Sequence, residues 1–337
     1  MDVDFAAVTL RFARPLPTAF GELRERELLT IRIKGDDEVV GWGEAAPLEP
    51  YDGVSREAVR AALAAYAPIL RGGEGARPAE LLEACRNTVN LPQALAAVDM
   101  ALWDRAGNRE GKPVSALLSD DPARTVRVNA TIAAEDRAEA ATQAAAAAAA
   151  GFTCVKIKVG IGDDAGRVAA VRAAVGPEIE LRLDANGAWS VEEAVRAIEA
   201  LAPAGLELVE EPVHGIDELR AVRDRVAVRV AMDETARLHG SLTAKVADAV
   251  CLKISRCGGI SSLLAQAALV RASGADVYVA STFDGPLGIA AAVHCAAALR
   301  PSAASGLGTL EFFEDEFDVL SLEDGEIAVP TKPGLGV

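Results

Sequence analysis

From Val126 onward the sequence alternates between short apolar segments and helix-like segments of about ten to fifteen residues. The apolar segments are rich in Val, Ile and Leu, which is typical of parallel strands buried on both faces. We expect strands at 126–132, 153–159, 179–184, 206–210, 228–232, 249–254 and 276–280, with a short eighth strand near 305–310. Eight strands joined by helical connections predict an α/β fold in which the sheet closes into a barrel.

The first part of the chain has a different pattern. It predicts three strands, at 4–12, 28–33 and 38–42, and Pro/Gly-rich loops at 15–21 and 47–53. Ser55 is the expected N-cap of a helix that extends to Ile69, and further helices are expected to begin at Pro78 and Pro92. The residues after 310 do not continue the alternation. We therefore predict a small α+β unit over 1–112, to which 311–337 return, and a barrel domain over 113–310.

Composition excludes several classes of protein. Hydrophobic residues make up 51% of the 337 residues, yet no apolar run approaches the roughly 18 to 20 residues of a membrane helix. The start of the chain lacks a basic segment, and five scattered cysteines suggest reduced thiols, so a cytoplasmic protein is expected. A net charge of −16 argues against nucleic acid and anionic membranes as partners. A small anionic ligand stays compatible with that charge, and so does a homo-oligomer.

A K-x-K pattern marks the expected strand at 153–159. Lys156 and Lys158 are two residues apart, so their side chains share one face of the strand. An isolated pattern of this kind is usually an edge strand with lysines in water. Here, however, only seven of the 34 basic residues are Lys, and another Lys, Lys253, occupies a later strand. A buried Lys can change its pKa and act as a base, which Arg does not do.

Acidic residues end three successive strands of the predicted barrel, namely Asp184, Glu210 and Asp233. One such residue alone commonly caps the next helix. Three on the same rim are harder to explain, because two like charges about 4 Å apart repel by about 4 kcal/mol at an effective dielectric constant near 20. The rim therefore requires a cation, and oxygen ligands of this type suit Mg²⁺.

The lysines and carboxylates together suggest a reaction. Lysines from the second and sixth barrel strands would reach the cavity from opposite sides of the metal. A substrate carboxylate bound there would place its α-carbon between two bases, and positive charge would stabilise the enediolate. We assign Lys158 as the base, and Lys156 as the cation that lowers the pKa of Lys158 and contacts the carboxylate.

The same motifs resemble the enolase superfamily, in its muconate-lactonizing subgroup. The resemblance rests on segments spread over nearly the whole chain, namely 41–47, 97–104, 153–160, 184–186, 209–212, 232–235 and 252–259. It implies an N-terminal capping domain over a (β/α)₇β barrel. It also implies that Asp184, Glu210 and Asp233 ligate Mg²⁺, for which Mn²⁺ can substitute, and that Lys158 and Lys253 flank the substrate.

Within the subgroup, segments 279–293 and 305–309 resemble the o-succinylbenzoate synthases of menaquinone biosynthesis. That resemblance implies a dehydratase in which Lys158 abstracts the α-proton and Lys253 is a cation beside the intermediate. N-succinylamino acid racemases, dipeptide epimerases and muconate cycloisomerases use the same scaffold and stay open as alternatives. Residues 283–286 depart from the pattern. The predicted substrate contacts are Phe20, Tyr51, Asn186, Ser281, Thr282 and Asp284.

Two other functions fit the sequence less well. Gly160, Gly162 and Gly166 follow a strand in a near-miss of a dinucleotide-binding fingerprint, but the preceding strand carries two inward lysines that NAD binding does not need. A barrel kept only for binding or assembly has no reason to retain the full set of lysines and carboxylates. Glu211 and Glu234, next to the proposed ligands, are expected to point outward and pair with neighbours.

Overall fold

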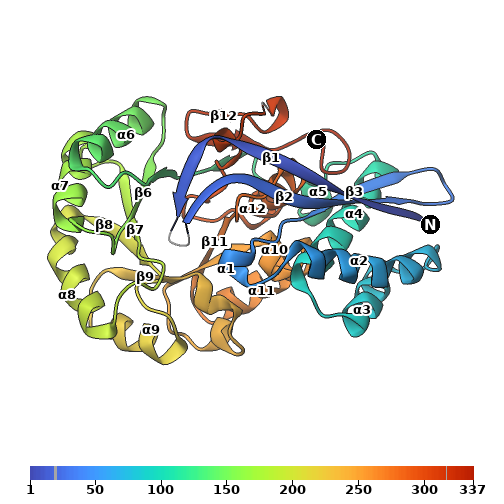
Figure 1. The fold of residues 1–337 in the computed structure, drawn as a ribbon, viewed down its shortest axis with the longest axis horizontal. Helices are drawn as coiled ribbons and strands as arrows, with labels where there is room; N and C mark the ends of the chain where they lie inside the picture. The colour runs from blue at the N-terminus through green and yellow to red at the C-terminus, as the bar shows by residue number, and fades with distance from the viewer. Residues whose placement is uncertain (19–20, 316) are drawn as a thin grey trace.

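The computed structural model describes residues 1–18, 21–315 and 317–337. The first part of the chain is an antiparallel sheet with the order β1-β2-β3, followed by helices (Figure 1). Ser55 caps α2 by accepting a hydrogen bond from the Ala58 amide, as predicted. The elements of this cap are β1 (Asp2–Thr18), β2 (Gly21–Lys34), β3 (Val40–Ala45), α1 (Glu49–Asp52), α2 (Arg56–Arg71), α3 (Pro78–Thr88), α4 (Pro92–Glu110) and α5 (Val114–Leu118).

The β1–β2 hairpin is longer than the sequence pattern predicts. We expected a loop at 15–21, but β1 continues to Thr18, which pairs with Gly21. β1 is an edge strand, and its pairing with β2 shifts register between Arg11 and Leu16. Prolines are tolerated at such edges and irregularities, because the missing N–H is not needed there. The predicted loop at 47–53 likewise contains the short helix α1.

The second part of the chain is a curled parallel sheet surrounded by helices (Figure 1). Its strands follow the order β11-β10-β9-β8-β7-β6-β5. Isolated pairs, Val128 with Ser305 and Ala280 with Gly306, join the ends of the sheet in place of the expected eighth strand. The strands are β5 (Ala130–Ile132), β6 (Cys154–Lys158), β7 (Glu180–Asp184), β8 (Leu206–Glu210), β9 (Arg229–Met232), β10 (Ala249–Lys253) and β11 (Asp276–Ala280). The helices are α6 (Arg137–Ala149), α7 (Asp164–Val175), α8 (Val191–Leu201), α9 (Ile216–Arg223), α10 (Ile254–Cys257), α11 (Ile260–Ala272) and α12 (Pro286–Leu299).

Two details of the barrel differ from the prediction. The single strand expected at 126–132 is divided into β4 (Thr125–Arg127) and β5, and β4 belongs to a small separate sheet with β12 (Leu322–Glu323) and β13 (Glu326–Ala328). Between β9 and β10, where a helix was expected, lie two short 3₁₀ segments. Buried Glu211 accepts hydrogen bonds from the amides of Asp233 and Thr235, which fixes a tight turn after β9.

The C-terminal segment contacts both parts of the molecule. The Phe313 ring stacks on Phe12 of β1 at 4.7 Å, and the Leu335 amide donates to Asp104 of α4. β13 pairs with β4, next to the start of the barrel. These contacts link the C-terminal segment to the cap, whereas the division of the chain at 112 and 310 stays a prediction.

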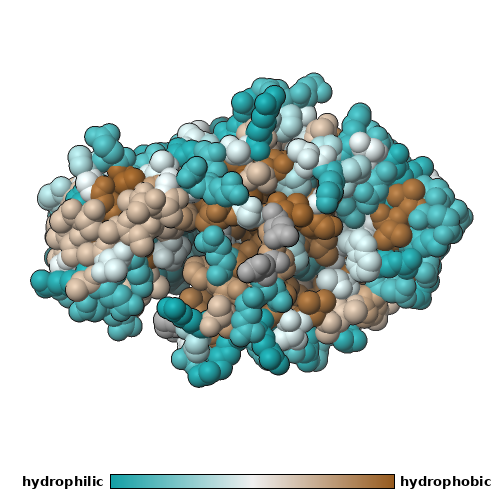
Figure 2. All heavy atoms as spheres, turned by 90° about the horizontal axis from the view of Figure 1, so that it is seen from above, coloured by the Kyte–Doolittle hydropathy of each residue, from teal (hydrophilic) through white to brown (hydrophobic). Residues whose placement is uncertain are grey.

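The molecule's surface is uneven in polarity. Figure 2 shows hydrophilic surface around most of the outline and apolar surface gathered toward the middle of this face. Within the described ranges, none of the helices combines the length and the apolar character that a membrane crossing requires.

Candidate active site

The three carboxylates predicted to bind metal come together on one rim of the barrel. Asp184 ends β7 and lies in register beside Glu210, which ends β8, while Asp233 directly follows β9. Their exposed fractions are 2%, 1% and 1%, respectively. They meet because parallel strands present their C-terminal ends on the same side of the sheet.

Lys156 and Lys158 of β6 both point toward these carboxylates. The Lys156 Nζ lies 3.1 Å from Asp184 Oδ2 and 3.2 Å from Glu210 Oε1. The Lys158 Nζ donates to Asp184 Oδ2 at 2.6 Å and to Asn186 Oδ1 at 2.7 Å. The Lys158 side chain is 33% exposed, against 13% for Lys156. Lys158 is thus the more accessible of the two to a ligand.

Lys253, at the end of β10, lies in a more crowded environment. Its Nζ donates to Asp233 Oδ2 at 2.7 Å and to the Tyr51 hydroxyl at 2.8 Å, and it lies 4.8 Å from the centre of the Tyr51 ring. Arg256 also donates to Asp233 and to the Tyr51 hydroxyl. Tyr51 belongs to α1, so the cap supplies one wall of this part of the site.

Charges in the buried cluster compensate one another. Burial alone would raise the pKa of Asp184 and of Asp233, but Lys156 near Asp184 and Arg256 near Asp233 hold both pKa values well below the usual range. Burial alone would lower the pKa of Lys156 and of Lys253, but the same carboxylates raise both pKa values. These two lysines therefore stay protonated as long as the carboxylates have no other cation.

The donor set fits a hard divalent cation. Oxygens of Glu210 and Asp233 lie within 4.8 Å of one another, and the ammonium of Lys156 joins Glu210 to Asp184. The Cys251 thiol also lies within 4.8 Å of these Glu210 and Asp233 oxygens. Asp184, Glu210 and Asp233 together offer carboxylate oxygens on one rim, and these could hold Mg²⁺ or Mn²⁺, which prefer oxygen ligands.

The predicted substrate contacts differ in where they lie. Tyr51 and Asn186 contact the lysines, as described above, whereas Phe20 lies outside the described residues. Ser281 and Thr282 follow β11 and bond to Thr309 and Ser255, respectively. Asp284 is fully buried, and its carboxylate accepts hydrogen bonds from Thr282. Contact with a substrate stays a prediction for Ser281 and Thr282, while Asp284 is enclosed by the loop and the cap.

Several residues of the site were not identified from the sequence. Tyr278 of β11 donates to Glu210 Oε2 at 2.7 Å, a position that period-two alternation within β11 could have suggested. Arg256 follows Lys253 by three residues, and its local sequence pattern did not indicate a place in the site. Glu211 is fully buried rather than pointing outward, and Glu234 accepts a hydrogen bond from Asn186. Alternation does not hold there because each of these residues lies just beyond its strand.

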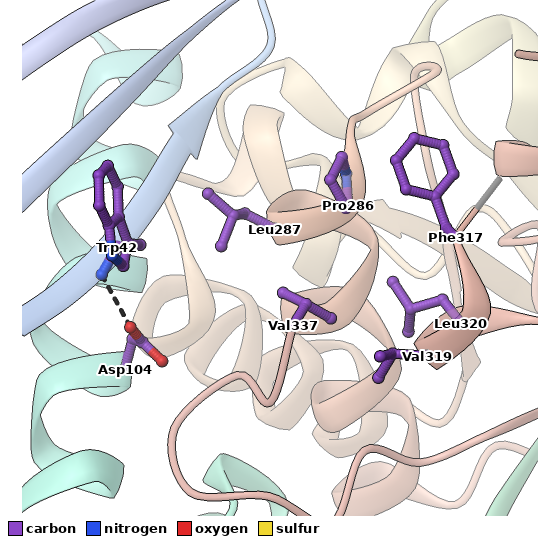
Figure 3. A pocket seen from close by; sticks show the side chains of 8 residues that line it. All are labelled: Trp42, Asp104, Pro286, Leu287, Phe317, Val319, Leu320 and Val337. Carbon is purple, nitrogen blue, oxygen red and sulfur yellow. Dashed lines mark hydrogen bonds between the residues drawn. The ribbon is translucent and has the colours of Figure 1, made fainter. Parts of the chain in front are cut away.

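One cavity lies away from this chemistry. It has a volume of about 400 Å³ and is bounded by β3, α4, the start of α12 and the C-terminal segment (Figure 3). Its lining is Trp42, Asp104, Pro286, Leu287, Phe317, Val319, Leu320 and Val337. Asp104 accepts hydrogen bonds from the amides of Trp42 and Leu335, so its carboxylate has a structural role. We assign this cavity no part in the reaction.

The fold and the site define the class of protein. A capped barrel with carboxylates at successive strand ends and lysines on β6 and β10 is an enzyme architecture of the enolase superfamily. Two family models match: the mandelate racemase / muconate lactonizing enzyme N-terminal domain over residues 1–119, and the enolase C-terminal domain-like family over residues 139–337. The chain belongs to the mandelate racemase / muconate lactonizing enzyme group of this superfamily.

Known relatives differ in their reactions. The chain is 32% identical to the L-Ala-D/L-Glu epimerase of Bacillus subtilis over 99% of its own length and 95% of that protein. A solved substrate-liganded complex of that epimerase covers 100% of the chain and 98% of the solved chain, with a TM-score of 0.90 at 30% identity. The o-succinylbenzoate synthase of Thermobifida fusca is 41% identical over 196 residues, which are 55% of this chain and 60% of that protein.

A third relative has been solved with ligands. The dipeptide epimerase of Enterococcus faecalis, in complex with Mg and the dipeptide L-Leu-L-Tyr, has a TM-score of 0.89 at 26% identity. It covers 99% of this chain and 98% of the solved chain.

Proposed function

We propose that this chain is a Mg²⁺-dependent enzyme that removes the proton α to a carboxylate and then eliminates water, as o-succinylbenzoate synthases do. The observation that carries the proposal is the position of Lys158 and Lys253 on either side of the Asp184–Glu210–Asp233 carboxylates. The substrate is a small anionic carboxylate, and the enzyme is expected in the cytoplasm.

The metal site supports proton abstraction. Asp184, Glu210 and Asp233 would hold Mg²⁺, which supplies the positive charge that stabilises an enediolate. Asn186 keeps a hydrogen bond to Lys158 and can hold its amine toward the α-carbon.

The dehydration moves one proton and breaks one carbon–oxygen bond. The Lys158 amine takes the α-proton, and the electron pair left on the substrate becomes the new carbon–carbon double bond as the β C–O bond breaks. The departing hydroxide takes up that proton from the Lys158 ammonium and leaves as water, which regenerates the Lys158 amine. Lys253, protonated and fixed by Tyr51, offers charge to the intermediate.

The different surroundings of the two lysines favour one base over two. Lys158 is one-third exposed, whereas Lys253 is almost fully buried and is bound to both Tyr51 and Asp233. A lysine fixed in this way is suited to remain a cation. The 41% identity to the T. fusca o-succinylbenzoate synthase supports the same reaction.

Epimerisation is the second candidate, and Arg256 favours it. Its guanidinium lowers the pKa of Lys253, against the larger and opposite effect of Asp233. Once a metal ion occupies Asp233, Lys253 could become a second base that returns a proton to the opposite face of the α-carbon. The epimerase relatives match over nearly the full length of the chain.

Incubation with Mg²⁺ in D₂O separates these reactions. The panel holds the β-hydroxy carboxylate precursor of o-succinylbenzoate, N-succinylamino acids and dipeptides, and products are followed by NMR. Loss of water from the first substrate supports the dehydratase. If only the N-succinylamino acids or dipeptides incorporate deuterium, with inversion at the α-carbon, the chain is instead a racemase or an epimerase.

A further inference from the structure

A buried cluster of charges joins the cap to the barrel beside the proposed site. It consists of Arg26 on β2, Glu44 on β3 and Asp284 on the loop 281–285, which connects β11 to α12. Their exposed fractions are 3%, 2% and 0%. Charged residues are rarely buried to this extent unless they are paired and hydrogen-bonded. We call this cluster the cap–loop latch.

The cap side of the latch holds the backbone of the loop. The Arg26 guanidinium donates to the carbonyl of Phe283 at 3.2 Å and to the carbonyl of Pro47 at 2.7 Å. Glu44 Oε1 accepts a hydrogen bond from the Gly285 amide at 2.6 Å. Two cap strands thus each hold one end of the segment 283–285.

Local conformation shows how closely the two parts fit. A Cβ at Gly285 would lie 2.4 Å from Glu44 Oε2, and one at Gly288 would lie 2.9 Å from Glu44 Oε1. Both positions therefore need glycine for the carboxyl group to approach. Phe283 has a φ of 56°, which is strained for a residue other than Gly, Asn or Asp. Its ring contacts Phe12 of β1 edge-on at 5.6 Å.

The barrel side of the latch continues toward the lysines. Asp284 accepts hydrogen bonds from the amide and hydroxyl of Thr282, and the Thr282 hydroxyl lies 3.0 Å from the hydroxyl of Ser255. Ser255 follows Lys253 by two residues. The loop's shape is therefore coupled by direct contacts to the end of β10.

We propose that Arg26 and Glu44 are positioning residues, which hold the loop 281–285 in its catalytic conformation only while the cap is seated on the barrel. The inference rests on the proposed function for its kinetic consequence. Its structural content, that two cap side chains order a barrel loop, does not depend on the reaction.

Protonation distinguishes the two carboxyl groups of the latch. Burial, followed by the charge of Asp284, raises the pKa of Glu44 to about 8. One guanidinium facing two buried carboxyl groups is balanced when one of them carries a proton, and Glu44 is that group at neutral pH. Glutamine should therefore replace Glu44 with little loss, whereas Asp284→Asn removes the charged partner of Arg26.

The test compares Arg26→Met with Arg105→Met. Arg105 is a matched control because it is also a buried cap arginine, but it bonds to Asp37 and to the Val39 carbonyl, away from the barrel. Both variants are measured, and so are Glu44→Gln and Asp284→Asn. The measurements are hydrogen exchange of the amides in 281–287, Mg²⁺ affinity by calorimetry, Tm, and kcat and KM for α-proton exchange.

Arg26→Met should speed amide exchange in the loop and lower kcat/KM by between about tenfold and about 100-fold, with unchanged Mg²⁺ affinity. Glu44→Gln should keep wild-type kinetics, and Asp284→Asn should resemble Arg26→Met. The two arginine variants are compared at an equal loss of Tm. If the amides of the loop then exchange at the same rate in both, Arg26 does not hold the loop and the proposal is wrong. If the wild-type chain exchanges no α-proton from any substrate, the proposed function fails, and loop exchange alone still decides the latch.

Discussion

Lys156 and Lys158 stand two residues apart on one strand, yet their contacts divide the chemistry between them. Lys156 is held between two carboxylates, whereas Lys158 has one carboxylate and the Asn186 amide as partners. A base must release its proton and reach a substrate, so the more exposed Lys158 suits that role. Lys156 instead balances the charge of Asp184 and Glu210.

Replacing Lys158 by Met should therefore lower kcat for α-proton exchange by between about 100-fold and about 10,000-fold, which is the usual contribution of a general base. The fold and Mg²⁺ binding should survive, because the three carboxylates remain. The measurement is the rate of deuterium incorporation, with calorimetry for the metal. Lys112→Met, at an exposed lysine whose partner is Glu110, is the control. Full activity in the Lys158 variant would assign the base elsewhere.

At the scale of elements, strand ends were predictable and long-range partners were not. The apolar runs before Asp184 and Glu210 indicate buried parallel strands, and that alone places both carboxylates on one rim. The contact of Arg26 with the Phe283 carbonyl joins residues 257 positions apart, and no local pattern encodes it. The division of β4 from β5 escaped prediction for the same reason, because β4 pairs with the distant β13.

The Ala-rich helix α6 gives a test at this scale. Its N-cap Asp136 accepts hydrogen bonds from the amides of Ala138 and Glu139, so two of the otherwise unpaired donors are satisfied. Asp136→Ala should lower the free energy of unfolding by about 1 kcal/mol and leave kcat unchanged. Urea unfolding gives the value, with Glu135→Ala, an exposed neighbour outside the helix, as the control. Equal stability of the two variants would show that the cap contributes nothing.

At the scale of the whole molecule, the cap and the barrel build one site together. Tyr51 of α1 contacts Lys253 of β10, and Glu44 of β3 holds the loop after β11. One apolar core is shared, because Leu10, Leu28 and Met100 of the cap pack together with barrel residues, and a second core lies within the cap. The polar contacts near the proposed site add to this packing. The site is therefore complete only when the cap lies on the barrel, because the cap supplies Tyr51 and Glu44.

This arrangement predicts how stability depends on pH. The pKa of Glu44 is raised by burial from 4.5 to about 8 in the folded chain, so the folded state binds its proton more tightly than the unfolded state. The stability from this proton is complete below about pH 4.5 and is lost as the pH rises to about 8, at up to about 1.4 kcal/mol per pH unit.

Urea unfolding across this window, for the wild type and for Glu44→Gln, measures the effect. Glutamine does not titrate, so the variant should lose less stability than the wild type between about pH 5 and about pH 8. Arg26 and Asp284 face Glu44 in both proteins, which leaves the Glu44 proton as the difference. Identical slopes would mean that Glu44 is already ionised in the folded chain.

The proposed function requires that Asp184, Glu210 and Asp233 hold one divalent ion between Lys158 and Lys253. A crystal structure of the Mn²⁺ complex, with the ion located by anomalous scattering, tests it most directly. We expect one peak at about 2.1 to 2.2 Å from an oxygen of each of the three carboxylates, with both lysine Nζ atoms facing the ligand side of the ion. A peak at the neighbouring Glu211–His214–Glu234 group, or none on the rim, would contradict it.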